Sequence, residues 1–324
     1  MRVTTRRGGL PQRFSHRAAV YDTQNDLVRL AVPLIERARR RESPVALSVA
    51  TSTERLLRDI VGSSGLIRLA TPEPTQRRSG QSVASRRARE LRELTDRDGP
   101  VVVIAQHDPD MGLLDGRAWV ETDAAMNLAL ATMPVTMTCL YRDPLDPVLA
   151  AAARWNHPLW VHGDGSVQEN PDHRQPAEVL AACPAGAPAP LGDPDQELAF
   201  TPWQLTDLRT AVGAAAHTAG LAPDRADDFV LAVNEVAGNA VEHGYGTGLL
   251  QIWLRPLFLT CEVHDSGVLG NPLPGMRLPQ PAEHRGRGVW IARQLCDLLH
   301  VWADQDGTHV RLETARGANI VGPS

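Results

Sequence analysis

Short apolar runs alternate with amphipathic helical patterns through the first half of the chain. Runs rich in Val, Ile, Leu and Ala predict strands at 18–21, 45–50, 67–70, 101–105, 135–140 and 159–162. Between them, apolar residues spaced by three and four predict helices at 25–41, 54–61, 82–95, 122–131 and 147–155. Continuous apolar strands separated by helices are typical of a parallel sheet covered on both faces. The polar stretch 71–85, with two prolines and an Arg pair, is predicted to be a mobile loop.

A long helical pattern in the second half brings a carboxylate and a carboxamide together. Apolar side chains fill one stripe of a helix that stops near Gly244, so Glu235 and Asn239, four residues apart, share its more polar face. An amide oxygen suits Mg²⁺, and a neighbouring carboxylate can take a proton from an attacking hydroxyl. These are the two tasks of phosphoryl transfer. When the pair is taken alone, a solvated helix face is the simpler explanation of it.

Two glycine-containing segments follow this helix. Asp265 ends an alternating strand predicted at 258–264, where its carboxylate can accept a hydrogen bond from an exocyclic amine. Gly267 lets a planar ring approach the backbone. The second segment opens a helix predicted at 289–299 and offers N–H groups and positive charge to phosphate oxygens; its residues are Arg285, Gly286, Arg287 and Gly288.

Composition narrows the chemistry of the chain. The length of 324 residues favours two domains, each with a core of its own. All 33 basic residues are arginine. A phosphate-loop lysine, a Schiff-base lysine and a lysine general base are therefore excluded. The net charge of −5 argues against a broad surface for nucleic acid.

The cysteines and the hydropathy pattern indicate a cytoplasmic protein without a membrane segment. The four cysteines, which show no paired metal-binding spacing, are expected to be reduced thiols: Cys139, Cys183, Cys261 and Cys296. No apolar run reaches the roughly 18 residues that a membrane helix needs.

Several histidines in the first half allow both a ligand-binding and a structural interpretation. His16 and His157 could line a sensor pocket, although residues of this kind more often brace a core. His107, Asp108 and Asp110 follow a predicted strand at the sheet edge where open α/β sheets bind ligands. A solvated turn explains this group equally well.

The segments around Glu235, Asp265 and Gly286 resemble the N, G1 and G2 boxes of the GHKL (HATPase_c) fold shared by gyrases and histidine kinases. The resemblance covers about residues 195–315 and implies a Bergerat-type α/β sandwich. Within that superfamily, the runs 234–245, 286–297 and 306–312 are most similar to serine-kinase anti-sigma factors of the RsbW and SpoIIAB type, common in actinobacteria.

This resemblance implies ATP and Mg²⁺ as cofactors and assigns roles to individual residues. Glu235 would be the general base, Asn239 the Mg²⁺ ligand and Asp265 the adenine anchor. The residues implied to contact the nucleotide are Asn239, His243, Asp265, Gly267, Arg285, Gly286, Arg287, Gly288 and Thr308.

One departure from the family pattern leaves alternatives open. The first glycine box of the family reads Asp-x-Gly-x-Gly, whereas residues 265–270 read DSGVLG, so that Leu269 is expected to crowd the nucleotide. The proline-rich segment 271–284 is expected to form a lid. One alternative is an ATP-gated partner-binding module without kinase activity. A sensor histidine kinase is the other, but the segment 183–194 is rich in Ala, Pro and Gly and does not encode a phospho-acceptor hairpin.

The first half resembles the MEDS sensory domain (DcmR type) over about residues 12–175. The strings that carry the resemblance are FSHRAAVY at 14–21, LYR at 140–142, HPLWV at 157–161 and NP at 170–171. Membership implies signal reception, with no ligand class attached. We therefore expect an α/β protein of three parts: a sensory domain at 12–178, an Ala/Pro/Gly linker at 179–196 and an ATP-binding kinase domain at 197–316.

The expected function is that of a cytoplasmic signalling regulator, an ATP-binding anti-sigma factor and serine/threonine protein kinase controlled by its sensory domain. Expected partners are a sigma factor or a STAS-type anti-anti-sigma protein, together with an unidentified sensor ligand. Neither nucleic acid nor a membrane is expected as a partner. The family also makes a homodimer an expectation.

Overall fold

A computed structural model describes residues 13–70, 79–107, 116–184, 186–280 and 286–316. The contacts divide the chain into two compact units. Unit 1 holds the described residues of Met1–Pro72 and Arg87–Val179, and unit 2 holds those of Glu73–Arg86 and Leu180–Ser324. Each unit has its own hydrophobic core. The predicted α/β class is confirmed.

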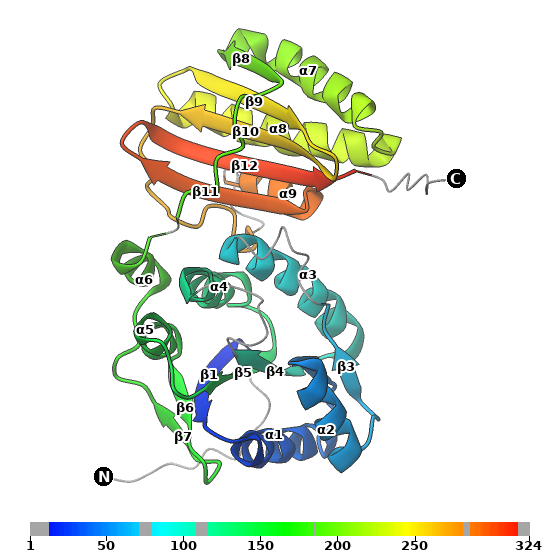
Figure 1. Ribbon diagram of the computed structural model, residues 1–324, viewed down its shortest axis with the longest axis vertical. Coiled ribbons are helices and arrows are strands. Elements are labelled where there is room, and N and C mark those ends of the chain that lie inside the picture. Colours follow the sequence, from blue (N-terminus) through cyan, green and yellow to red (C-terminus); the bar gives the residue numbers. More distant parts are fainter. Residues whose placement is uncertain (1–12, 71–78, 108–115, 185, 281–285, 317–324) are drawn as a thin grey trace. The chain divides into compact units, whose positions relative to one another are not determined.

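Unit 1 is built on a seven-stranded sheet with the order β3-β2-β4-β5-β1-β6-β7 (Figure 1). All neighbouring strands from β3 to β6 are parallel, and β7 is antiparallel to β6. The strands are β1 (Ser15–Tyr21), β2 (Val45–Ser48), β3 (Leu66–Arg68), β4 (Val101–His107), β5 (Val135–Arg142), β6 (Leu159–Val161) and β7 (Val167–Glu169). The predicted parallel sheet is confirmed, whereas the short and exposed β7 was not predicted because three residues carry no readable alternation.

Helices cover both faces of this sheet. α1 and α2 lie on one face, and α4 and α5 lie on the other (Figure 1). Local sequence fixes where some of them begin: Thr23 and Asp26 form a capping box at the start of α1, and Asp146 caps α5 just before Pro147. The helices that lie wholly or partly in unit 1 are α1 (Gln24–Arg39), α2 (Thr51–Val61), α3 (Gly80–Asp98), α4 (Gly116–Ala129), α5 (Pro147–Asn156) and α6 (Pro176–Ala182).

Two segments differ from the sequence-based expectation. The loop predicted at 71–85 is helical from Gly80 onward, and residues 71–78 lie outside the described residues. The Ser79 hydroxyl accepts a hydrogen bond from the Ser82 N–H, and the Ser85 hydroxyl donates to the backbone of the preceding turn. Polar side chains that are satisfied in this way can be buried, so their polarity did not indicate a loop. The helix α6 also extends into the first residues of the expected linker.

Unit 2 is a five-stranded antiparallel sheet, in the order β11-β12-β10-β9-β8, with helices α7, α8 and α9 along one face (Figure 1). Its strands are β8 (Gln196–Phe200), β9 (Gly248–Leu254), β10 (Phe258–Asp265), β11 (Leu298–Asp304) and β12 (Gly307–Ala315). Its helices are the 3-10 turn η3 (Pro202–Gln204), α7 (Leu205–Thr218), α8 (Pro223–His243) and α9 (Gly288–Leu295).

One face of the helix α8 packs into the core, and the same helix carries the predicted site residues Glu235 and Asn239. Gly244 is its carboxyl cap, as the sequence predicts, and Pro223 occupies its first turn. The apolar stripe packs into the core of unit 2 and comprises Phe229, Ala232, Val233, Val236, Ala237 and Ala240. The other face of the same helix is thereby held in a fixed orientation.

The helix predicted at 289–299 is shorter than expected. α9 ends at Leu295, Cys296 is extended, and Leu298 already begins β11. The Arg225 guanidinium donates to the Leu295 carbonyl at 3.1 Å, which satisfies one acceptor at the helix end. The apolar residues after the helix belong to a strand that pairs with β12, so their hydrophobicity alone could not separate helix from strand.

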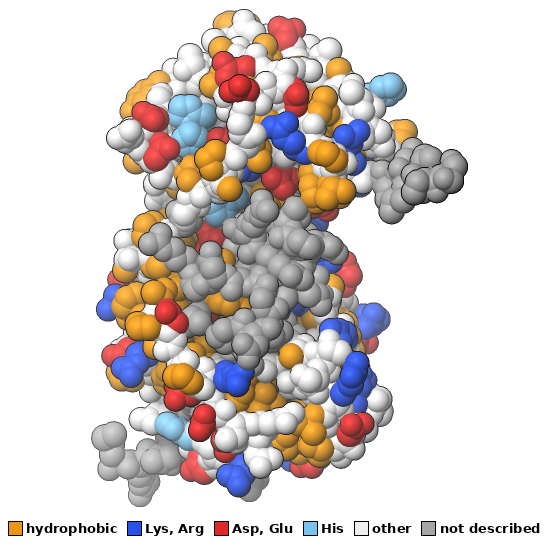
Figure 2. Space-filling view, in the orientation of Figure 1, with side chains coloured by type: hydrophobic (Ala, Val, Ile, Leu, Met, Phe, Trp, Pro, Cys, Tyr) orange, Lys and Arg blue, Asp and Glu red, His pale blue; other side chains and the backbone are white. Residues whose placement is uncertain are grey.

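The surface of the described residues is mixed in charge. Figure 2 shows Arg and acidic side chains interspersed on the visible face, without a broad patch of one sign among the side chains coloured there. In the described part of the chain, no helix combines the length and the hydropathy that crossing a membrane requires.

Candidate functional site

Glu235 and Asn239 lie half-buried on successive turns of α8. The Asn239 amide Nδ2 donates to the Glu235 backbone carbonyl at 3.0 Å. This bond uses the donor side of the amide, so the carbonyl oxygen Oδ1 is the atom left to act as a metal ligand. His243, one turn later, is exposed at the end of the helix.

The start of α9 lies directly against this pair. A Cβ atom added at Gly288 would lie 2.5 Å from Glu235 Oε2 and 3.4 Å from Asn239 Nδ2. Only glycine therefore fits without moving the Glu235 carboxylate. Gly286 has a φ of +82°, a conformation that favours glycine. The geometry leaves a cradle of backbone, which suits an anion at a helix start.

The backbone donors of this helix start remain accessible to a ligand. No described side chain caps the first turn of α9. Gly286 and Arg287 are exposed, and the Arg287 guanidinium donates to the Gln280 carbonyl at 3.3 Å. Arg287 thus contacts the described part of the expected lid. Arg285, also predicted for this segment, lies outside the described residues.

Asp265 ends β10 as predicted and anchors a second cluster. The Gly267 N–H donates to Asp265 Oδ1 at 2.8 Å, and the Thr308 hydroxyl donates to the Gly267 carbonyl at 3.0 Å. Asp265 and Thr308 are paired across β10 and β12. A Cβ added at Gly267 would lie 2.4 Å from the His243 carbonyl oxygen. The glycine turn therefore packs directly on the carboxyl end of α8.

The environment of Asp265 suits recognition of a hydrogen-bond donor. Burial raises the pKa of this carboxyl, while the Gly267 N–H and the nearby imidazoles of His264, His243 and His309 partly offset the rise. A carboxylate withdrawn from water gains when a ligand donates to it, because an unmet buried acceptor is costly.

Gly244 and Gly307, which were not predicted as site residues, are in close contact with Asp265. A Cβ added at Gly244 would lie 2.4 Å from Asp265 Cβ. Gly307 has a φ of +139°, and a Cβ there would lie 2.0 Å from the Asp265 carbonyl oxygen. From the sequence, Gly244 was interpreted only as a helix stop. Its close contact with Asp265 could be found only from the fold, because Asp265 is on β10, which is distant from Gly244 in sequence.

The described part of the expected lid packs on α9. Gly275 has a φ of +66°, and a Cβ there would lie 2.5 Å from the Trp290 backbone nitrogen. Leu273 and Met276 are buried, and residues 281–284 of the lid lie outside the described residues. Leu269, which was expected to crowd the nucleotide, packs against the core of unit 2.

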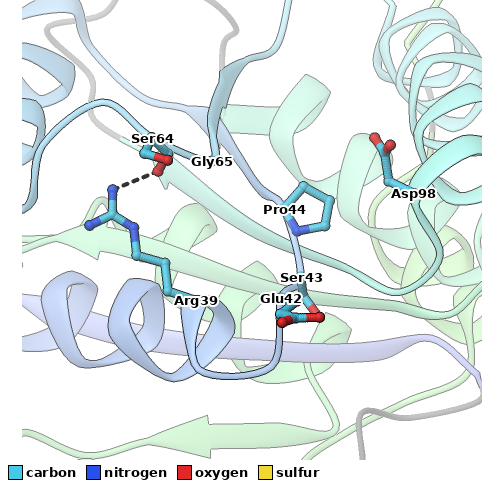
Figure 3. A pocket seen from close by; sticks show the side chains of 7 residues that line it. All are labelled: Arg39, Glu42, Ser43, Pro44, Ser64, Gly65 and Asp98. Carbon is cyan, nitrogen blue, oxygen red and sulfur yellow. Dashed lines mark hydrogen bonds between the residues drawn. The ribbon is translucent and has the colours of Figure 1, made fainter.

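A pocket of about 660 Å³ in unit 1 is separate from these clusters (Figure 3). Its lining includes Ser43 and Pro44 just before β2, and Ser64 and Gly65 just before β3. It therefore opens at the amino ends of the strands, whereas ligands of open α/β sheets bind at the carboxyl ends. The Arg39 guanidinium at its wall donates to the Gly62 and Ser64 carbonyls, which is a structural role.

Comparison with known protein families assigns a domain to each part of the chain. Residues 198–314 match the family model of the histidine kinase-like ATPase domain. Residues 15–158 match that of MEDS, the methanogen/methylotroph DcmR sensory domain. The comparison with curated proteins found no match. The ATPase domain family implies ATP binding, usually with Mg²⁺, and its pairing with a sensory domain supports a signalling regulator. The chain thus carries an N-terminal MEDS sensory domain and a C-terminal histidine kinase-like ATPase domain.

Proposed function

We propose that the chain is an ATP-dependent serine/threonine protein kinase of the anti-sigma type, regulated by its MEDS domain. Its partners would be a sigma factor and a small STAS-type antagonist that carries the acceptor serine. The observation that carries this proposal is the contact between Glu235 and the start of α9, with Asn239 beside them. A base, a metal ligand and a phosphate cradle then adjoin one another.

Each residue of the site has a distinct task in this proposal. Asn239 would hold Mg²⁺ through Oδ1, and the backbone at Gly286 and Gly288 would cradle the phosphates. Asp265, Gly267 and Thr308 would bind the adenine, which fits their mutual hydrogen bonds and the packing of Gly267 on the carboxyl end of α8. The glycine cradles at Gly267 and Gly288, which a Cβ would fill, support the fit of a nucleotide.

The reaction moves one phosphoryl group and one proton. Bound Mg-ATP supplies the phosphoryl group, and the serine hydroxyl of the antagonist receives it. Glu235 takes the hydroxyl proton as the new oxygen–phosphorus bond forms, and ADP leaves. The proton is then released from Glu235 to solvent.

The test is phosphoryl transfer by a Glu235→Gln variant. We expect the parent chain to transfer label from γ-labelled ATP to serine of a STAS-type protein encoded in the same genome. Glu235→Gln should still bind Mg-ATP but transfer on the order of 10²-fold to 10⁴-fold more slowly, because general-base catalysis contributes about that much. Glu242→Gln, an exposed glutamate on the same helix, is the matched control and should transfer at the parental rate.

The outcomes separate this proposal from the alternatives. If the parent binds ATP but labels no protein, and Glu235→Gln regulates its partner normally, the domain is an ATP-gated binding module. Acid-labile label on a histidine would instead indicate a histidine kinase. Either result rejects the serine/threonine kinase.

Gly288→Ala tests the cradle independently of Glu235 chemistry. The added Cβ must displace the Glu235 carboxylate, the far end of a flexible side chain, so folding stability should change little while transfer falls at least about tenfold. Gly238→Ala on α8 is the control, because its Cβ meets nothing within 4 Å. That variant should keep full transfer and gain roughly 0.5–1 kcal/mol in stability, as expected for alanine inside a helix. Equal transfer by the two variants would contradict the assignment of the cradle.

A further inference from the structure

Four buried side chains that can ligate metals converge inside unit 1. His16 is on β1, Cys139 on the adjacent β5, Asp123 on α4, and His157 caps the carboxyl end of α5. One ligand atom from each lies within 4.8 Å of those of the other three. All four residues are at most 2% exposed. Two strands and two helices therefore bring two imidazoles, a thiol and a carboxyl together at one buried position.

The imidazoles of His16 and His157 both have Nε2 available to a ligand at this buried position. His16 Nδ1 bonds the side-chain oxygen of Asn127 at 2.9 Å, and the Asn127 amide group donates in turn to the Asn156 carbonyl. His157 Nδ1 donates to the Ala153 carbonyl at 2.9 Å. Since each Nδ1 faces an acceptor oxygen, each carries the proton, and the lone pair is on Nε2.

The two Nε2 atoms differ in what they contact. His16 Nε2 lies 3.3 Å from Cys139 Sγ. His157 Nε2 is fully buried and has no hydrogen-bond partner among the described residues. Such an atom is costly in a core, and it calls for an explanation. A ligand at the centre of the four side chains would supply the missing partner.

We propose that His16, Asp123, Cys139 and His157 bind one divalent transition-metal ion of the zinc class. Two imidazoles, a thiolate and a carboxylate are the donors that tetrahedral zinc accepts. Metal bonds of about 2.0–2.3 Å in that geometry put ligand atoms roughly 3.3–3.8 Å apart. The four atoms thus need only a small contraction, and the pair of His16 and Cys139 already has this spacing.

The groups around the ligands match the outer shell of a metal site. Metal-bound histidines commonly donate their second N–H to a carbonyl or carboxylate oxygen, as His16 and His157 do here. The Tyr141 hydroxyl donates to Asp123 Oδ2, which orients the carboxylate. Metal binding would replace the thiol proton of Cys139 by a metal–sulfur bond and release that proton to solvent.

The test measures metal in the full-length, untagged chain. Because the four side chains are buried, the metal must enter as the chain folds, so the protein is produced in medium supplemented with Zn²⁺ or with Co²⁺. We expect about one equivalent of metal per chain by elemental analysis, and a cobalt–thiolate charge-transfer band in the cobalt form. Cys139→Ser should lose the band, and His157→Gln should retain at least about tenfold less metal. Cys261→Ser, a buried cysteine of unit 2, is the matched control and should keep both signals.

Either of two results would overturn the proposal. One is a parent chain with less than about a tenth of an equivalent of metal. The other is a charge-transfer band that survives in Cys139→Ser, which would put the metal elsewhere. If the variants fail to fold, X-ray absorption on the cobalt-loaded parent decides, because the proposal requires one sulfur and at least two imidazoles in the first shell.

Discussion

Replacing Asn239 by alanine is expected to abolish the binding of Mg-ATP. The variant removes the only side-chain atom that we assign to the metal, while Glu235 and the glycine cradle stay in place. Without a hard oxygen ligand, the Mg²⁺ that neutralises the phosphates is no longer held by the chain. We expect the affinity for Mg-ATP to fall on the order of 100-fold or more, a loss of about 2.7 kcal/mol in binding free energy. Titration calorimetry measures it.

The neighbouring Asn234 provides a control for this experiment. It is on the same helix, and its Oδ1 accepts from the Arg209 guanidinium at 3.3 Å, away from Glu235 and Gly288. Asn234→Ala should therefore bind Mg-ATP with parental affinity. Full affinity in Asn239→Ala would remove the site assignment altogether, and with it the proposed kinase mechanism.

Replacing Arg311 by methionine is expected to destabilise unit 2 by about 3–5 kcal/mol, the cost of leaving a buried charge without its partner. Arg311 Nε and Nη2 donate to Glu262 Oε2 at 2.9 and 2.8 Å, and Nη1 donates to the Ala189 carbonyl at 2.9 Å. Only 6% of Arg311 and 8% of Glu262 are exposed. Methionine keeps much of the side-chain volume, so the loss reports the charge. Chemical denaturation followed by circular dichroism measures it.

Two further variants show that the effect arises from the buried charge. Adding Glu262→Gln to Arg311→Met should recover part of the loss, because the buried carboxylate that has lost its Arg311 partner is then gone. Arg40→Met breaks the exposed pair with Glu36 and should cost less than about 1 kcal/mol. Equal losses for Arg311→Met and Arg40→Met would contradict the buried pair.

The same pair gives stability a defined pH dependence. Burial alone would raise the pKa of Glu262, but hydrogen bonds from His309 and Arg311 outweigh it and hold the pKa below its usual value. A depressed carboxyl pKa stabilises the fold above the unfolded pKa, about 4.3, and this contribution is lost as the pH falls through the folded value. In Arg311→Met, we expect this part of the acid dependence to be reduced.

The sequence predicted elements whose hydrophobic period is unambiguous. The parallel strands of unit 1 and the helix α8 were found because burial on a sheet or along one helix stripe leaves a readable pattern. The carboxyl end of α9 was missed, because Leu298 and Leu299 fit a helix and a strand equally well until β12 pairs with them. The start of α3 lies where two predictions overlapped, the loop at 71–85 and the helix at 82–95, because its polar side chains are buried with internal hydrogen bonds.

The candidate site was predictable only in its local parts. Glu235 and Asn239 share a face because four residues complete one turn of helix. That Gly288 belongs to the same nucleotide site was implied by the resemblance to a family, and its contact with Glu235 came only from the fold, since no spacing rule joins α8 to α9. No family resemblance or metal-binding spacing indicated the cluster of His16, Asp123, Cys139 and His157. His16 and Cys139, for example, are 123 positions apart in the sequence.

The hydrogen bond from the Asn239 amide to the Glu235 carbonyl also bears on how fast a nucleotide can be captured. The helix backbone itself fixes the rotamer of Asn239, the proposed metal ligand, before anything binds. Little side-chain entropy is then lost on association, so the site is preorganised. Encounter by diffusion, rather than rearrangement within α8, would then set the association rate.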